Sequence, residues 1–170
     1  LDAILVAGPV QILVNNAGLH AAAVFPGMGA EQWHTVMDVN LNGFYNVTQP
    51  LTLPMIRTRW GRIITISSVA GVVGNRGQVN YAADKAALHA ATKSLALELA
   101  SRKVTVNAVA PGIIATEMSE GSFDQAAIDR LVPMKRAGQP EEVADLVAFL
   151  ASDRAAYITG QILSINGGMV

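Results

Sequence analysis

A tyrosine and a lysine stand four residues apart near the middle of the chain, in Tyr81-Ala-Ala-Asp-Lys85. Residues four apart share one face of an α-helix, so both side chains can point into one cleft. A free phenol loses its proton near pH 10, and a nearby positive charge lowers that pKa. The pair therefore has the composition of an acid/base catalyst. The alternative is an ordinary surface pair, because a chain with three tyrosines can contain this spacing by chance.

Small and polar residues follow three apolar segments that read as strands. Ser67 and Ser68 follow residues 63–66, an Asn-Asn-Ala-Gly run occupies residues 15–18, and Pro111 and Gly112 follow residues 104–110. Open α/β sheets bind their ligands at the carboxyl ends of parallel strands. A serine there can donate to a substrate carbonyl oxygen, and small residues let the backbone approach a ligand closely. Each segment alone is more simply a turn, but the three together predict a site at one edge of a sheet.

The elements that must position these residues alternate along the chain. Residues 11–14, 62–67, 104–110 and 161–165 are rich in Ile, Leu and Val, which is typical of strands buried in a parallel sheet. Helical patterns cover residues 31–58, 81–100, 124–131 and 141–150. This alternation predicts βαβ units of an α/β fold, in one domain over residues 1–170. Pro50, Pro54 and the run Asn40-Leu41-Asn42-Gly43 predict that the helix over residues 31–58 is kinked.

The composition narrows the classes of function. The 170 residues are 51% hydrophobic and 15% charged, with a net charge of −1, which gives no case for binding nucleic acid or a membrane surface. The absence of cysteine excludes disulfides and Cys-ligated zinc. The histidines, His20, His34 and His89, have no metal-ligand spacing, so we expect ordinary packing or surface roles and no metal site. We expect a cytoplasmic protein that does not enter a membrane.

In their order and spacing, these motifs resemble the short-chain dehydrogenase/reductase family. The resemblance extends over residues 10–170 and implies a Rossmann-like, doubly wound parallel sheet with helices on both faces, and hydride transfer to or from a nicotinamide. It implies that Tyr81 is the general acid/base and that Lys85 lowers the Tyr81 pKa and hydrogen-bonds the nicotinamide ribose. By the same resemblance Ser68 orients the substrate carbonyl, and Asn40, at the break in its helix, holds a water that relays protons to Lys85.

The resemblance also implies contacts to the cofactor, in which Tyr81 and Lys85 take part. Two further sets of residues match segments that contact the cofactor in the family. The stretch on the adenosine-ribose side corresponds to Asn16, Ala17 and Gly18. The loop that holds the nicotinamide carboxamide corresponds to Pro111, Gly112, Ile114 and Thr116. The family's glycine-rich turn has no counterpart in this sequence. We therefore expect the first βαβ units to be absent from the chain as given, which would be the C-terminal two-thirds of a family member and could not hold a dinucleotide tightly.

Within the family, the runs GRIITISSVAG, NYAADKAAL and TVNAVAPGIIATEM resemble the 3-oxoacyl-(acyl-carrier-protein) reductases of bacterial fatty-acid synthesis. This implies NADPH as the reductant, with NADH remaining open, and a homotetramer. It also implies that Arg59 and Arg102 dock an acidic acyl carrier protein, although an arginine at a helix end also complements the helix dipole. Residues 118–123 resemble the family's mobile substrate-side lid.

Two alternatives remain open from the sequence. The first is the same chemistry on another alcohol, ketone or acyl-CoA. The second is a truncated, inactive chain that serves as a structural subunit.

Overall fold

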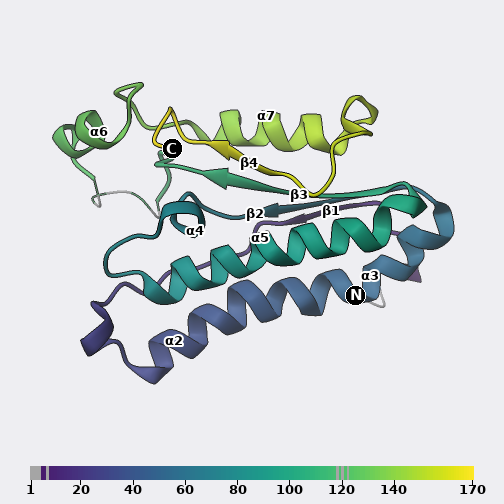
Figure 1. Ribbon diagram of the computed structural model, residues 1–170, viewed down its shortest axis with the longest axis horizontal. Helices are drawn as coiled ribbons and strands as arrows, with labels where there is room; N and C mark the ends of the chain where they lie inside the picture. The colour runs from purple at the N-terminus through teal and green to yellow at the C-terminus, as the bar shows by residue number, and fades with distance from the viewer. Residues whose placement is uncertain (1–4, 7, 118, 120, 122) are drawn as a thin grey trace.

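A parallel sheet covered by helices on both faces forms the centre of the molecule (Figure 1). The computed structural model describes residues 5, 6, 8–117, 119, 121 and 123–170. In this part of the chain the strands are β1 (Ile12–Asn15), β2 (Gly61–Ile66), β3 (Val104–Pro111) and β4 (Ile162–Ile165), and they lie side by side in that order. The predicted Rossmann-like α/β fold is confirmed, and each predicted strand agrees with the structure to within one residue at either end.

All neighbouring strands run parallel, which brings their carboxyl ends to one edge. Asn15 pairs with Thr65, Ile66 with Val109, and Pro111 with Ile165. The two central strands, β2 and β3, are buried along nearly their whole length, whereas β1 and β4 alternate between more and less exposed positions. Two of the strands whose carboxyl ends form the predicted site, β2 and β3, are therefore buried strands at the centre of the sheet.

Helices on the two faces of the sheet enclose two separate hydrophobic cores. On one face lie α3 (Gly43–Thr58) and α5 (Val79–Leu99), and on the other lies α7 (Pro140–Ala151) (Figure 1). The core under α3 and α5 consists of buried Leu51, Met55, Ile63, Ala96, Leu99, Val104 and Val106. The core under α7 consists of buried Ile64, Val109, Leu150 and Ala155. Ile63 and Ile64 point to opposite faces, as successive strand residues must.

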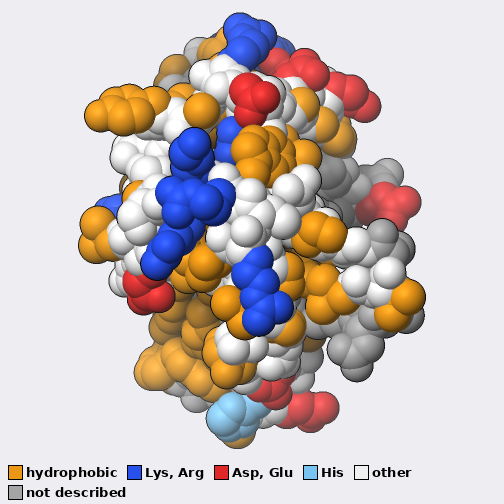
Figure 2. Space-filling view, turned by 90° about the vertical axis from the view of Figure 1, so that its right-hand side faces the viewer, with side chains coloured by type: hydrophobic (Ala, Val, Ile, Leu, Met, Phe, Trp, Pro, Cys, Tyr) orange, Lys and Arg blue, Asp and Glu red, His pale blue; other side chains and the backbone are white. Residues whose placement is uncertain are grey.

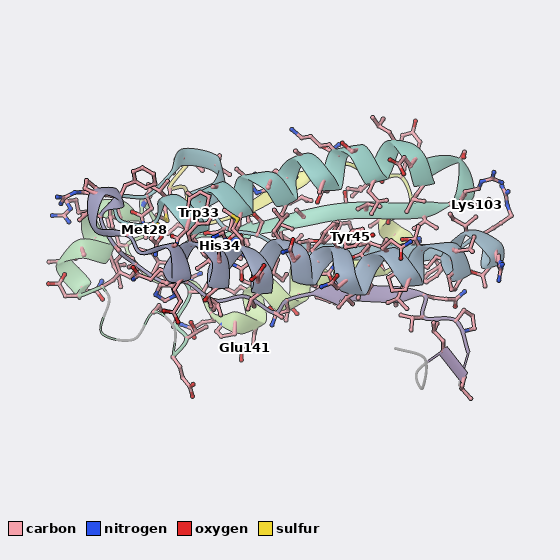
Figure 3. The ribbon with its side chains drawn as sticks, turned by 90° about the horizontal axis from the view of Figure 1, so that it is seen from below. Met28, Trp33, His34, Tyr45, Lys103 and Glu141 are labelled. Atoms are coloured by element: carbon pink, nitrogen blue, oxygen red, sulfur yellow. The ribbon has the colours of Figure 1, made fainter. Side chains whose placement is uncertain are left out.

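The helix predicted over residues 31–58 is interrupted, as expected, at Asn40. It divides into α2 (Ala30–Met37), a π-helical turn η2 (Asp38–Asn42) and α3. Figure 3 shows this run from below, with Trp33 on α2 and Tyr45 on α3. The Asn42 side chain donates to Asp38 Oδ1 at 2.7 Å across the π-turn. Pro50 and Pro54 lie inside α3, which continues through both.

Shorter elements complete the described chain. They are α4 (Ala70–Val73), α6 (Gln125–Leu131) and the 3₁₀ turns η1 (Phe25–Gly27), η3 (Ala100–Arg102) and η4 (Asp153–Ala155). Only α4 has no counterpart among the predicted helices. Three positions of the predicted lid, Met118, Glu120 and Ser122, lie outside the described residues, as do residues 1–4 and 7. Within the described part, no helix has the length and apolar character of a membrane span.

Candidate active site

The carboxyl edge of the sheet receives the start of α5, which runs antiparallel to the strands. Its alanine-rich sequence favours a helix, and Tyr81 and Lys85 lie in its first turns. Lys85 is only 4% exposed, and its Nζ donates to the carbonyl oxygen of Ile66, the last residue of β2, at 3.1 Å. The same Nζ lies 5.4 Å from the centroid of the Tyr81 ring. The predicted pair thus shares one face of α5 at the predicted edge.

Burial dominates the protonation of both side chains. It raises the pKa of Tyr81, a hydrogen bond with Ser68 lowers that pKa, and the charge of Asp84 raises it again. Burial also lowers the pKa of Lys85, which the charge of Asp84 partly opposes. The expected lowering of the Tyr81 pKa by Lys85 is not what this structure shows. At neutral pH the phenol is held in its protonated form.

The two serines after β2 have different roles. Ser68 Oγ accepts a hydrogen bond from the backbone N–H of Ala70 at 3.1 Å, which starts α4, and interacts with the Tyr81 hydroxyl. Ser67 is buried; its Oγ donates to the carbonyl oxygen of Lys85 at 3.2 Å and lies 2.6 Å from His89 Nε2. The His89 tautomer decides which of the two atoms donates in this second contact.

His89 was expected to have an ordinary role, and its contact with Ser67 ties α5 to the end of β2. Its pKa is lowered by burial and by the charges of Lys93 and Lys85, which favours the neutral ring. His20, also expected to be ordinary, lies edge-on to Tyr81 with 6.3 Å between ring centroids. Neither contact has a signal in the sequence, because each joins residues from different elements.

Asn40 lies at the π-turn and is buried, with 3% exposure. Its Oδ1 accepts from the Leu19 N–H at 2.9 Å, and its Nδ2 donates to the Leu19 carbonyl at 2.9 Å and to Asp84 Oδ2 at 2.7 Å. A Cβ atom added to Gly18 would lie 3.4 Å from Lys85 Nζ and 3.5 Å from Asn40 Oδ1. The structure therefore places Asn40 and Lys85 next to the same glycine, Gly18, while the water relay at Asn40 stays a prediction.

Asp84 is a site residue that the sequence reasoning missed. It is fully buried, its Oδ1 has no hydrogen-bond partner in the described structure, and its pKa is raised to about 6. Burial is the main cause, opposed by the Asn40 hydrogen bond and the charge of Lys85. One signal was available: Asp84 stands three residues after Tyr81, a spacing that puts it on the same helical face.

The residues expected to contact a cofactor line the same edge. The Val69 N–H donates to the Pro111 carbonyl at 2.9 Å, which joins the ends of β2 and β3 next to Ser68. The Gly112 N–H donates to the Ile165 carbonyl at 2.9 Å, and a Cβ on Gly112 would lie 2.8 Å from Asn166 Cβ, so packing alone requires glycine here. Ile114 bridges to Gly138, and Thr116 is exposed.

On the β1 side, Asn16 and Ala17 are exposed and lead to Gly18 beside Lys85. An ammonium group, a protonated phenol and a backbone of small residues therefore meet at one edge. This donor set fits the hydroxyl groups of a ribose, such as the one that carries the nicotinamide in a dinucleotide.

Arg59 and Arg102 lie elsewhere. Each is exposed and stands just before a strand, β2 or β3, so both are at the amino edge of the sheet. Arg59 Nη2 donates to the Ser101 carbonyl at 3.3 Å, which brings the two arginines together. Figure 2 views this end and shows Lys and Arg side chains gathered on it, and Figure 3 shows Lys103 at the same end. Most of α5 and the turn η3 separate this end from Tyr81, a length of about 30 Å.

Comparisons with known proteins agree with this geometry. The sequence model of the family described as Enoyl-(Acyl carrier protein) reductase matches residues 3–170. The chain is 50% identical over 158 residues to the 3-oxoacyl-[acyl-carrier-protein] reductase FabG of Aggregatibacter actinomycetemcomitans, covering 92% of this chain and 65% of that protein. It is 49% identical over 166 residues to the protein of the same name from Thermotoga maritima, covering 96% of this chain and 67% of that protein.

A third relative carries another name. Nodulation protein G of Azospirillum brasilense is 50% identical over 164 residues, covering 95% of this chain and 67% of that protein. The chain thus spans about two-thirds of the length of these relatives, 65–67%. Because a family model matches nearly the whole chain and half of all aligned positions are identical, the chain belongs to the short-chain dehydrogenase/reductase family.

Proposed function

We propose that this protein reduces the 3-oxo group of an acyl thioester on acyl carrier protein, with NADPH as reductant, in cytoplasmic fatty-acid synthesis. The observation that carries the proposal is the contact of Lys85 Nζ with the end of β2, beside Tyr81 and Ser68, at the carboxyl edge of a parallel sheet. The substrate class is supported by relatives that are about 50% identical and are named 3-oxoacyl-[acyl-carrier-protein] reductases.

In this mechanism Ser68 and Tyr81 both hydrogen-bond the substrate carbonyl oxygen. When bound, NADPH supplies the hydride that reduces the carbonyl carbon. Tyr81 donates its proton to the oxygen, which completes the 3-hydroxyacyl thioester. Burial keeps Tyr81 protonated at neutral pH, as a proton donor must be. Lys85 then restores the Tyr81 proton and takes a proton from solvent through the water relay predicted at Asn40, whose amide holds the backbone of Leu19.

The residues of this chain that would hold the cofactor surround the same pair. Lys85 would donate to the nicotinamide ribose, and the loop after β3 would hold the carboxamide through Pro111, Gly112, Ile114 and Thr116. The stretch Asn16, Ala17 and Gly18 would line the adenosine-ribose side. NADH stays open as a substitute, because none of these residues selects a 2′-phosphate.

The docking of the carrier protein is proposed at Arg59 and Arg102. Two exposed cations at one end suit an acidic partner. Since about 30 Å of α5 separates them from Tyr81 of the same chain, the tethered acyl group would have to reach along α5 or into a neighbouring subunit. A homotetramer is proposed on the exposed apolar side chains of α3 and α5: Tyr45, Leu53 and Leu97.

The test of the chemistry is Tyr81→Phe in the full-length protein. Removal of the hydroxyl leaves the ring and its packing, so we expect kcat for 3-oxoacyl reduction to fall by about 10²–10⁴-fold with an unchanged circular dichroism spectrum. Tyr157→Phe is the matched control, because Tyr157 is fully exposed and follows η4, away from the site. A Tyr81→Phe enzyme that keeps wild-type activity would contradict the mechanism.

The substrate class needs a separate comparison. We expect the charge reversals Arg59→Glu and Arg102→Glu to raise KM for a carrier-protein thioester and to leave KM for the matching CoA thioester unchanged, more strongly at low salt. Equal effects on both thioesters would remove the docking proposal and favour an acyl-CoA substrate. Clear binding of NADPH to the 170-residue chain would remove the inactive-subunit alternative, which predicts a folded chain without binding.

A further inference from the structure

A carboxylate with no ion-pair partner is enclosed within the active site. Asp84 has no measurable exposure, and neither described ion pair includes it, since these are Arg62–Asp153 and Arg136–Glu142. One of its oxygens accepts from Asn40 Nδ2 at 2.7 Å, and the other is buried without a partner. A buried, half-satisfied carboxylate destabilises a fold unless something offsets it. Its place between Tyr81 and Lys85 points to a role in the site.

The hydrogen bond to Asp84 adds a third constraint on the orientation of the Asn40 amide. An aspartate oxygen can only accept from an amide NH₂, so Asn40 Nδ2 must face Asp84. The Asn40 carbonyl oxygen is then turned toward the Leu19 N–H, and Nδ2 also reaches the Leu19 carbonyl. Both backbone groups of Leu19 are held in this way. A flipped amide would lose all three hydrogen bonds.

The orientation of the Asn40 amide also affects the surroundings of Lys85, because it fixes the position of Leu19. Gly18 directly precedes Leu19, and a Cβ atom on Gly18 would lie within 3.4 Å of Lys85 Nζ. The backbone after β1 is therefore held against the Lys85 ammonium by a chain of contacts that begins at Asp84.

The charges around Asp84 come mainly from its own helix. Lys85 and Tyr81 on α5 are the titratable groups whose charge interacts with it. The titratable side chains of α2 and η2, which pack against α5, are Glu31, His34 and Asp38, and all three are exposed. His20 faces Tyr81 from the segment after β1. A negative charge on Asp84 therefore acts on the two proposed catalytic side chains.

We propose that Asp84 is a positioning residue of this site: it fixes the Asn40 amide, and with it Gly18 and Leu19 beside Lys85, and places a negative charge next to Lys85 and Tyr81. The proposal rests on the proposed function, which supplies the reaction that Asp84 modulates. The effect of Asp84 on the positions of Asn40, Gly18 and Leu19 can be tested through NADPH binding, without a measurement of catalysis.

Two substitutions in the full-length protein separate the hydrogen bond from the charge. Asp84→Asn keeps an acceptor oxygen for Asn40 Nδ2 and removes the charge, whereas Asp84→Ala removes both. Glu98→Gln is the control, because it removes one exposed charge from the same helix, 14 residues or about 21 Å from Asp84. The readouts are the NADPH dissociation constant by fluorescence, the pH profile of kcat/KM, and the melting temperature.

We expect Asp84→Ala to weaken NADPH binding about tenfold, the effect of one hydrogen bond, and Asp84→Asn to restore it to within about threefold of the wild type. We expect Asp84→Asn to move the alkaline limb of the pH profile, where Tyr81 loses its proton, to lower pH by about 0.5–1 unit. The sign follows because the Asp84 charge raises the Tyr81 pKa. Glu98→Gln should leave both readouts unchanged.

The proposal is overturned if Asp84→Ala binds NADPH as the wild type does, or if the Asp84→Asn profile coincides with the wild-type profile. If Asp84→Ala does not fold, the pH profile of Asp84→Asn decides. An inactive Tyr81→Phe enzyme together with wild-type behaviour of both Asp84 variants would remove this inference alone. A wild-type protein that does not reduce 3-oxoacyl thioesters would remove the proposed function, and the NADPH measurement would still test the positioning role.

Discussion

Gly71 in α4 lies directly against the backbone that carries the catalytic lysine. A Cβ atom added there would lie 2.8 Å from the Lys85 carbonyl carbon, 2.9 Å from the Ala86 nitrogen and 2.9 Å from Lys85 Cβ. Ordinary contacts begin at about 3.4 Å, so the closest approach is 0.6 Å too short. None of these atoms is the end of a flexible side chain. Gly71→Ala must therefore push α4 and α5 apart or displace Lys85.

Two opposing effects set the change in stability. Alanine favours a helix over glycine by up to about 1 kcal/mol, whereas overpacking a well-packed contact costs about 1–3 kcal/mol. The collision involves backbone atoms, so we expect the larger values of overpacking and a net loss of about 1–2 kcal/mol. A displacement of about 0.6 Å at Lys85 also disturbs proton delivery, and misplacement by about 1 Å can lower a rate about 100-fold. We therefore expect kcat/KM to fall about tenfold or more.

The assay is urea denaturation and kcat/KM of Gly71→Ala beside Gly27→Ala. Gly27 is exposed in η1, and a Cβ there would meet nothing within 4 Å, so the control adds the same methyl group without a collision. Wild-type stability of Gly71→Ala would refute the packing argument. Reduced stability with wild-type kcat/KM would show that α4 moves away and leaves Lys85 in place, which refutes the link to catalysis.

Two further predictions concern stability alone. The pKa of Asp84 is raised from 3.8 to about 6, so the folded state binds more protons than the unfolded state between these values, and stability falls as the pH rises through about 6. Asp84→Asn should remove this dependence on pH and raise the free energy of unfolding above pH 7 by up to about 3 kcal/mol. The free energy of unfolding is measured from about pH 4 to about pH 8, and the same pH dependence in the variant and the wild type would contradict this. Asn107 is buried in β3, donates to the Ile158 carbonyl at 2.8 Å and accepts from the Gln161 N–H at 3.1 Å. Asn107→Ala leaves both backbone groups without a partner and should lower the free energy of unfolding by about 2–3 kcal/mol, whereas Asn75→Ala, on an exposed loop, should change it by less than about 0.5 kcal/mol.

Strands and long helices were predictable because each has a local cause. Runs such as Ile63 to Ile66 combine β-branched residues with apolar character on both faces, and such runs suit the centre of a parallel sheet. The break at Asn40 was predictable because Asn and Gly disfavour a helix interior. By contrast, α4 contains a glycine and two valines, which are weak helix formers, and it depends on the Ser68 hydroxyl and on packing against α5.

The candidate site was predictable as a set of residues but not as a set of contacts. Tyr81, Lys85 and Ser68 follow from spacing and from their places after strands. Asp84 could not be ranked above other acidic residues, because its burial depends on how closely η2 approaches α5. The place of Arg59 and Arg102 at the amino edge was predictable from the sequence, since both residues stand just before a predicted strand.

The burial of β2 and β3 bears on amide hydrogen exchange. Both strands are buried on both faces between two cores, so their amides should exchange only on global unfolding. Ser68 follows β2, and Lys85 donates to the carbonyl oxygen of Ile66 at the end of the same strand. The proposed proton-transfer residues are therefore held on the part of the described sheet that should exchange most slowly.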